Sequence, residues 1–273
     1  MGATVSEALG GATDAIAAVG IDTPRIDAEV LLEGVTGRGR AELVADRKAT
    51  IAPGEARAFS EAVRRRLRKE PVAYILGRKG FRHIELAVDR RVLIPRPETE
   101  MLVELALELK PQSVLEIGTG SGAVALAVAN EIPGCRVEAT DTSAGALEVA
   151  RANAQTLGLA DRVGLTHGTW PSPGEFDLIL ANLPYVAEDG PVAADVAAWE
   201  PPEALFAGPD GLDVIREVLD SLPASGVLAP AIGLEIGFDQ GESVSELLAQ
   251  AGFARTGVRQ DLARIDRLVV GLK

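Results

Sequence analysis

The strongest constraint on the fold is an alternation of short apolar runs with amphipathic segments, which begins at about residue 98. The apolar runs, each typical of a buried strand, cover residues 113–118, 136–141, 176–182, 231–237 and 263–272. The segments of helical period between them cover residues 122–132, 144–158, 211–222 and 242–253. This order predicts an α/β domain whose parallel sheet carries helices on both faces. Ligands of such sheets bind beyond the carboxyl ends of the strands, where the strand order reverses.

The N-terminal part of the chain differs, because it contains helical periods and no strand pattern. Apolar residues recur at helical spacing over residues 25–37, with Gly37 as a stop signal. A second segment, residues 52–70, starts at a Pro-Gly pair and ends in a basic turn that suits the helix dipole. Residues 1–80 are therefore predicted to form a small helical bundle.

A short segment joins the two parts. Residues 81–97 alternate apolar and polar side chains, with Asp89 and Arg90 near the middle, which predicts a β-hairpin. Pro95 and Pro97 forbid continued pairing. We interpret the segment as a connector between the helical bundle and a domain formed by residues 98–273.

Charge and cysteine content exclude several classes of protein. The formal net charge is −13 over 273 residues. This charge argues against a protein that binds long stretches of nucleic-acid backbone, because such binding needs a basic surface. Cys135 is the single cysteine, so neither a disulfide nor a structural zinc site is expected. No apolar run reaches the length of a membrane span, and the N-terminus lacks the basic start of a signal peptide. We expect a cytoplasmic protein without a metal or a membrane partner.

A glycine-rich turn follows the first predicted strand of the α/β domain. Glu116 ends that strand, and Gly118, Gly120 and Gly122 follow at alternate positions before a helix. Glycines let the backbone turn tightly and approach a ligand closely. Asp141, at the end of the next strand, can bind both hydroxyls of a ribose or cap the following helix. The pair fits a dinucleotide or an S-adenosylmethionine site.

The sequence Asn-Leu-Pro-Tyr ends another apolar strand of the same sheet. Asn182 offers a carbonyl acceptor, Pro184 stiffens the turn, and Tyr185 supplies a flat ring. Two acceptors and a ring can hold a planar amide NH2, which is what methylation of a weakly nucleophilic nitrogen requires. By itself, the motif would fit an ordinary turn that ends a strand.

Together these motifs resemble those of the protein-(glutamine-N5) methyltransferases of peptide chain release factors, the HemK or PrmC family. The matching segments, which span nearly the whole chain, are residues 70–81, 93–100, 115–122, 182–185, 199–215 and 234–244. The segment LIPRPETE, residues 93–100, is the most specific of them. Single pieces are weak signals, but the ordered set is specific.

The resemblance implies a seven-stranded, Rossmann-like, S-adenosylmethionine-dependent methyltransferase domain behind a helical domain that docks the release factor. It implies methyl transfer to the side-chain nitrogen of the glutamine in a Gly-Gly-Gln loop, with S-adenosylhomocysteine as the second product. We expect the protein to act as a monomer on release factors, without direct contact to nucleic acid.

The resemblance also implies roles for individual residues. The cofactor residues would be Glu116, Gly118, Thr119, Gly120, Ser121, Gly122, Asp141, Trp170 and Asn182, with Asp141 on the ribose and Trp170 on the adenine. The substrate residues would be Ile94, Pro95, Arg96, Asn182, Leu183, Pro184 and Tyr185. Asn182 and the Pro184 carbonyl would accept the glutamine NH2, and Tyr185 would pack on the amide. These three would be the catalytic residues.

Two departures from the family pattern leave alternatives open. Leu183 stands where the family usually has a first proline, and Thr169 stands where an acid often precedes the tryptophan. One alternative is a diverged member that methylates a small molecule. Another is adenine-N6 methylation of nucleic acid, which the acidic charge and LIPRPETE disfavour. A third is a binding module without turnover, which the intact glycines, Asp141 and Asn182 disfavour.

Overall fold

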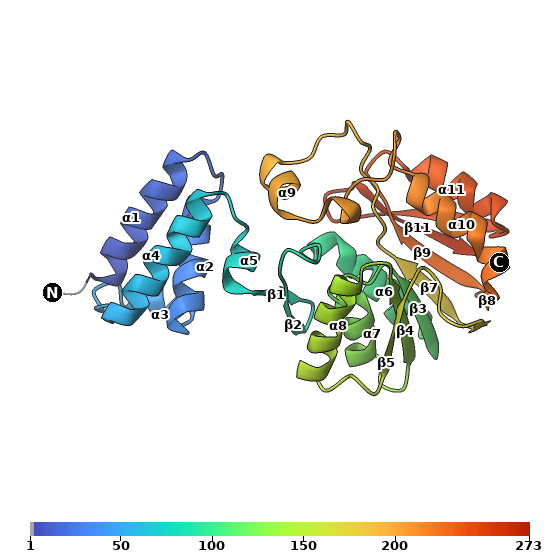
Figure 1. Cartoon of the computed structure of the whole chain (residues 1–273), viewed down its shortest axis with the longest axis horizontal. Helices are drawn as coiled ribbons and strands as arrows, with labels where there is room; N and C mark the ends of the chain where they lie inside the picture. The colour runs from blue at the N-terminus through green and yellow to red at the C-terminus, as the bar shows by residue number, and fades with distance from the viewer. Residues whose placement is uncertain (1–2) are drawn as a thin grey trace. The chain divides into compact units, whose positions relative to one another are not determined.

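The computed structural model describes residues 3–273, excluding the side chain of Val44, and divides into two compact units (Figure 1). The first unit runs to Arg78 and includes Ala194–Trp199, and the second comprises Lys79–Ala193 and Glu200–Lys273. Each unit has a core of its own, so each is described separately.

The first unit is helical, as the sequence predicts. Its helices are α1 (Val5–Ala18), α2 (Pro24–Thr36), α3 (Arg40–Ala45), α4 (Pro53–Leu67), α5 (Val72–Leu76) and α9 (Ala194–Trp199). Leu9, Leu31 and Phe59, on α1, α2 and α4, are buried in one core. Gly37 adopts a left-handed conformation and ends α2, as expected from its position.

The hairpin lies earlier in the chain than the sequence predicts. Strands β1 (Arg78–Phe81) and β2 (Ile84–Ala87) pair around a two-residue turn that begins at Arg82, whose φ is 49°. No strand occurs over residues 88–96, so the prediction of pairing across Asp89 and Arg90 was wrong. The alternation there has another cause, because Val88, Val92 and Ile94 bury one side of a loop.

The second unit contains a seven-stranded sheet in the order β10-β11-β9-β7-β3-β4-β5. The strands are β3 (Ser113–Ile117), β4 (Arg136–Asp141), β5 (Val163–His167), β7 (Leu178–Ala181), β9 (Ala231–Glu235), β10 (Arg255–Gln260) and β11 (Asp266–Leu272). The Rossmann-like fold class is confirmed. The sheet is parallel except at one edge, where β11 pairs antiparallel with both β9 and β10. A short turn joins β10 to β11, and a short connection permits only antiparallel pairing.

Helices cover both faces of this sheet (Figure 1). The helices are α6 (Glu100–Leu109), α7 (Ala123–Glu131), α8 (Ala144–Thr156), α10 (Asp213–Ser225) and α11 (Gly241–Gln250), with 3-10 turns η1 (Pro97–Thr99) and η2 (Pro202–Ala204). Two short strands, β6 (Gly174–Glu175) and β8 (Val227–Leu228), form a separate pair. Residues of α6, α7 and α8 pack into one core, and residues of α10 and α11 pack into another on the opposite face.

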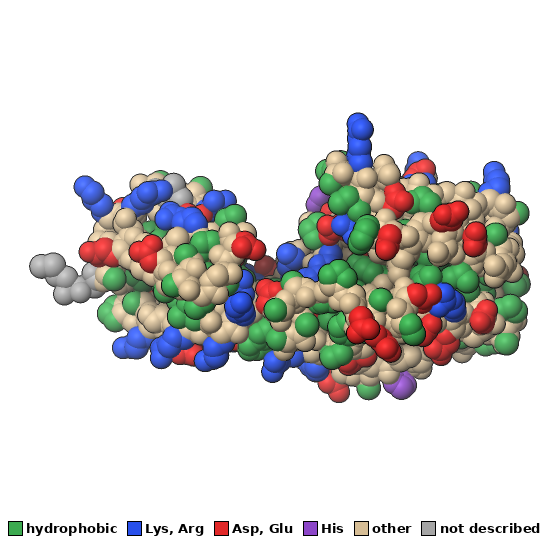
Figure 2. Space-filling model, turned by 90° about the horizontal axis from the view of Figure 1, so that it is seen from above, with side chains coloured by type: hydrophobic (Ala, Val, Ile, Leu, Met, Phe, Trp, Pro, Cys, Tyr) green, Lys and Arg blue, Asp and Glu red, His purple; other side chains and the backbone are tan. Residues whose placement is uncertain are grey.

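The chain order reverses at β3. The chain proceeds from β3 outward through β4 to β5 and then returns to β7 on the other side of β3. The carboxyl ends of β3, β4 and β7 therefore meet beside a topological switch point, where α/β sheets bind ligands. Acidic side chains are scattered over this unit's visible face in Figure 2, among many apolar and uncharged ones, whereas basic and acidic residues nearly balance over residues 1–78.

Candidate active site

The turn after β3 uses left-handed backbone conformations, which glycine adopts without strain. Gly118, Gly120 and Gly122 have φ values of 75°, 55° and 84°, in the left-handed region that favours glycine. A Cβ on Gly118 would lie 3.2 Å from Leu183 Cδ2, so the turn and the Asn-Leu-Pro-Tyr segment approach each other closely. The N–H groups of Gly118 and Thr119 both donate to the Thr140 carbonyl at 2.9 Å, which ties the turn to β4.

Three polar side chains in or beside the turn are buried, those of Glu116, Thr119 and Ser121. Glu116 Oε2 accepts hydrogen bonds from Thr119 Oγ1 at 2.6 Å and from the Ala125 N–H at 2.9 Å. Burial, with a smaller contribution from the charge of Asp141, raises the pKa of Glu116 to about 8. The Ser121 hydroxyl is buried and makes no hydrogen bond within the described residues. Buried hydroxyls are normally paired, so this one is suited to a bound ligand.

Asp141 lies at the end of β4. Its Oδ2 accepts from the Gly120 N–H and its Oδ1 accepts from the Ser143 N–H, each at 2.8 Å. The N-cap of α8 is Ser143, whose hydroxyl accepts from the Ala146 N–H at 3.2 Å. Asp141 therefore braces the glycine turn, and its remaining lone pairs line the cavity. Burial raises its pKa.

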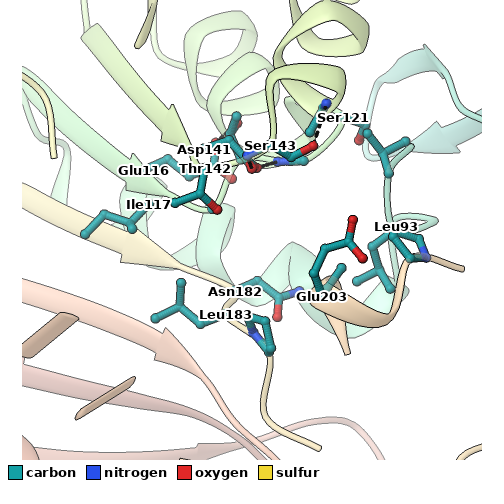
Figure 3. Close-up of a pocket in the computed structure, with 18 of the residues that line it drawn as sticks. Leu93, Glu116, Ile117, Ser121, Asp141, Thr142, Ser143, Asn182, Leu183 and Glu203 are labelled. Atoms are coloured by element: carbon teal, nitrogen blue, oxygen red, sulfur yellow. Dashed lines mark hydrogen bonds between the residues drawn. The ribbon is translucent and has the colours of Figure 1, made fainter. Parts of the chain in front are cut away.

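Asn182 follows β7 and faces the same cavity (Figure 3). Its Nδ2 donates to Thr99 Oγ1 at 3.1 Å. Leu183 and Pro184 line the cavity beside it. Tyr185 is absent from the lining, and its hydroxyl lies 3.5 Å from Glu235 Oε1. Burial raises the pKa of Tyr185 to about 12.

The Ile-Pro-Arg segment is held by an acid that sequence reasoning missed. The Ile94 N–H donates to Glu200 Oε2 at 2.9 Å, and Arg96 Nη2 donates to Glu200 Oε1 at 2.5 Å. Pro95 lines the cavity, whereas Ile94 and Arg96 do not. The sequence could have indicated a role for Glu200, because Glu200 belongs to the segment 199–215 that resembles the family.

Trp170 is not among the residues that line the cavity. Its Nε1 donates to Ser221 Oγ at 3.0 Å, and its side chain packs against the same hydrophobic core as Val214 and Val218. These two valines, one helical turn apart on α10, line the cavity instead. The amphipathic pattern of residues 211–222 could have identified them.

A cavity of about 280 Å³ lies at the carboxyl edge of the sheet. Figure 3 shows Glu203 with its carboxylate directed into this cavity, opposite Asp141 and Asn182. The unpaired Ser121 hydroxyl, the open glycine turn, the Asp141 carboxylate and the apolar α10 wall fit a cofactor with a polar tail, a ribose and a flat base. Among residues 3–273, no cluster of His, Cys, Asp and Glu could hold a metal, and no helix could cross a membrane.

Comparison with known proteins connects this cavity to a family. Residues 7–77 match the PrmC N-terminal domain, and residues 97–199 match the methyltransferase small domain. The chain is 38% identical to the release factor glutamine methyltransferase of Caulobacter vibrioides, over 99% of this chain and 96% of that protein. It is 42% identical to the protein of the same name from Moorella thermoacetica, over 97% of this chain and 96% of that protein.

A solved structure supports the fold alone. The hMettl16 catalytic domain, in complex with an RNA hairpin, is 14% identical and aligns with a TM-score of 0.55 over 84% of this chain and 85% of that chain. At that identity no function carries over, but the close relatives are similar over almost their full length. The chain belongs to the release factor glutamine methyltransferase family.

Proposed function

We propose that this protein transfers a methyl group from S-adenosylmethionine to the side-chain amide nitrogen of the glutamine in the Gly-Gly-Gln loop of peptide chain release factors. The names of the near-full-length relatives support this substrate. The observation that carries the proposal is the placement of Asn182. Its amide shares one cavity with the glycine turn and Asp141, and Thr99 occupies its donor end.

The cofactor residues are proposed from the chemistry of the cavity. When bound, S-adenosylmethionine supplies an electrophilic methyl group and leaves as S-adenosylhomocysteine. The turn from Gly118 to Gly122 would hold its methionine part, with Glu116 behind it, and Asp141 would bind the ribose hydroxyls. Val214 and Val218 would cover the adenine, with Trp170 packed against the same core.

The substrate residues would act by orientation and not by strong acid or base chemistry. Asn182 Oδ1 and the Pro184 carbonyl would each accept one N–H of the glutamine amide, leaving the nitrogen lone pair to face the methyl donor. Holding the reacting groups in this geometry is a large source of rate in bimolecular reactions. Pro95 and Leu183 would close the sides of the pocket, with Ile94 and Arg96 fixed by Glu200.

The helical unit would dock the body of the release factor, which accords with its match to the PrmC N-terminal domain. Because release factors act in translation termination, this proposal places the reaction in the cytoplasm. It also has the protein act as a monomer.

Intact-mass spectrometry of a purified release factor tests the proposal. The full chain and S-adenosylmethionine should add one methyl group to a wild-type release factor and none to a release factor whose Gly-Gly-Gln glutamine is alanine. Equal addition to both would place the methyl elsewhere. Cofactor binding without any addition would instead favour a small-molecule substrate.

A further inference from the structure

Exposed apolar side chains gather at the edge of the sheet that carries the cavity. Among the described residues of the second unit, the exposed large apolar side chains are Leu109, Leu228, Phe238, Val258, Leu262 and Ile265. Leu109 and Leu228 come just before β3 and β9, and so lie at the amino ends of these strands. The other four belong to the β9–α11 loop and the β10–β11 hairpin. We call these four residues the apolar rim.

The strand pairing places the apolar rim at the same edge as Asn182. Strand β9 runs parallel to β7, with Leu234 opposite Ala181, so both strands end together. Strand β11 lies beside β9 and runs antiparallel to it, with Leu268 opposite Glu235 (Figure 1). The turn that leads into β11 therefore lies where β9 and β7 end.

Phe238 is carried by a loop that is tied to the Asn-Leu-Pro-Tyr segment. The side chain of Gln240 accepts from the Gly237 N–H at 2.9 Å and donates to the Tyr185 carbonyl at 3.0 Å. The Phe238 side chain is nevertheless 65% exposed. A Cβ on Gly241 would lie 3.3 Å from the side chain of Val258, so this loop and the hairpin pack together.

Leu262 is carried by a turn that Asp261 holds in place. Asp261 Oδ1 accepts from the Ala263 N–H at 2.8 Å and from the Ile265 N–H at 3.0 Å, and its Oδ2 accepts from Arg267 Nε at 3.1 Å. Leu262 is fully exposed on this turn. Scattered apolar side chains are ordinary on a surface, but a group of them marks an interaction site. Loops that are already ordered also lose little conformational entropy on binding.

The size of the occupant follows from the spacing of the strands. Neighbouring strands lie about 4.8 Å apart, so β9, β11 and β10 end about 5, 10 and 14 Å from β7. A standard protein–protein interface covers about 800 Å² of each partner, which equals a disc of about 16 Å radius. A protein that inserts a side chain beside Asn182 therefore also covers the apolar rim. A small molecule that fills a cavity of about 280 Å³ does not extend so far.

We propose that the apolar rim binds the surface of the release factor that flanks its Gly-Gly-Gln loop, through apolar side chains of that surface. The inference rests on the proposed function, because it assumes that a glutamine of a protein enters the cavity. It deepens that function by naming a second contact for the substrate, outside the cavity, which a small-molecule substrate would not use.

Titration of the release factor into the full chain tests this contact. The protein is loaded with S-adenosylhomocysteine, so that binding is measured without transfer. Phe238→Ser and Leu262→Ser should each weaken the affinity for the release factor by about 10-fold. Phe238→Leu keeps an apolar side chain and should stay within about 3-fold of the wild type. Leu228→Ser is the matched control, because Leu228 is 57% exposed at the amino end of β9 and should leave the affinity unchanged.

Two further readouts distinguish a lost contact from damage to the protein. The replaced side chains are exposed, so the affinity for S-adenosylhomocysteine should stay within about 2-fold of the wild type. In steady-state transfer, Phe238→Ser and Leu262→Ser should raise KM for the release factor and leave kcat unchanged, because the apolar rim does not touch the reacting groups. A reduced kcat with an unchanged KM would contradict the proposal.

The outcomes separate this inference from the proposed function. Transfer by the wild type, with an unchanged release-factor affinity in the double variant of Phe238→Ser and Leu262→Ser, would overturn the apolar rim alone. Sedimentation that shows a dimer of the wild type and a monomer of the double variant would assign the rim to a second copy of this chain, and would also overturn the inference. Absence of transfer by the wild type to any release factor would overturn both proposals together.

Discussion

The Arg96 guanidinium donates to the buried Glu200 carboxylate across 104 positions of sequence, with Nη2 and Oε1 2.5 Å apart. The same carboxylate accepts from the Ile94 N–H. This pair fastens the segment 93–100 to the segment 199–215, and so fixes one wall of the cavity.

Arg96→Ala should therefore destabilise the protein and slow methyl transfer. The substitution leaves a buried carboxylate with one partner fewer, at a cost of about 1–3 kcal/mol in the free energy of unfolding. Urea unfolding measures the loss. Arg91→Ala is the control, because Arg91 pairs with Asp89 and Glu148 at the surface and should cost less than about 1 kcal/mol. If both variants lost the same free energy of unfolding, the Arg96–Glu200 pair would contribute no more to stability than a surface ion pair.

Asn182→Ala should abolish transfer to the release factor while the affinity for S-adenosylmethionine stays within about 3-fold. The substitution removes the proposed acceptor for the substrate amide, and the glycine turn and Asp141 remain in place. Mass spectrometry of the release factor and calorimetric titration of the cofactor measure the two effects. Transfer that survives in Asn182→Ala would show that the amide is held by other groups.

Asp141→Ala should weaken cofactor binding by about 10-fold to 100-fold, because it removes the proposed ribose acceptors and the brace on Gly120. Asp177→Ala is a matched control. Asp177 also accepts two backbone N–H groups, those of Gln112 and Ser113, but at the amino end of β3. Its loss should leave the cofactor affinity unchanged. A wild-type affinity in Asp141→Ala would limit Asp141 to bracing the turn.

Gly118→Ala should impair cofactor binding and transfer, since the new methyl would press on Leu183 at 3.2 Å. Gly158→Ala separates this contact from backbone strain, because Gly158 has a similar φ of 68° and open space around it. Both substitutions should cost about 1–2 kcal/mol in stability. Only Gly118→Ala should reduce the affinity measured by titration, and a parallel reduction in both would assign the effect to strain.

The stability of the free protein should decrease as the pH rises from about 4.5 toward 8. The pKa of Glu116 is raised from 4.5 to about 8 by burial, so the folded state holds this proton where the unfolded state releases it. The stabilisation is complete below the lower value and is lost as the pH passes the upper one. Each pKa unit corresponds to about 1.4 kcal/mol.

Urea unfolding between pH 5 and pH 9 measures this dependence. Glu116→Gln cannot ionise and should flatten the slope, whereas Glu108→Gln, an exposed carboxylate, should keep it. A wild-type slope in Glu116→Gln would assign the dependence to other groups, of which Glu235 is the next to test.

Local sequence pattern predicted the strands that carry the site. Strand β7 is a continuous apolar run and β3 is mostly apolar, whereas β4 alternates, and all three are followed by or end on the glycine or polar residues Gly118, Asp141 and Asn182. Strand β10 was missed because its side chains are mostly exposed, and β5 because three of its five residues are only half-buried. Neither gives a strong apolar signal.

Contacts between distant segments could not be read from local pattern. Glu200 looks like an ordinary surface acid until the fold brings it to Arg96, and Glu235 looks like the polar end of a strand until the Tyr185 hydroxyl faces it. The role of Trp170 on the adenine stays a prediction from the resemblance, and Val214 and Val218 in the cavity wall were not predicted. Such pairings depend on strand order and helix placement.

Peptide mapping by tandem mass spectrometry tests the central claim most directly. A release factor incubated with this protein and S-adenosylmethionine should carry one methyl group on the side-chain amide nitrogen of its Gly-Gly-Gln glutamine, and the same incubation with Asn182→Ala should leave that glutamine unmodified. A methyl group on another residue, or an unmodified release factor despite bound cofactor, would contradict the account.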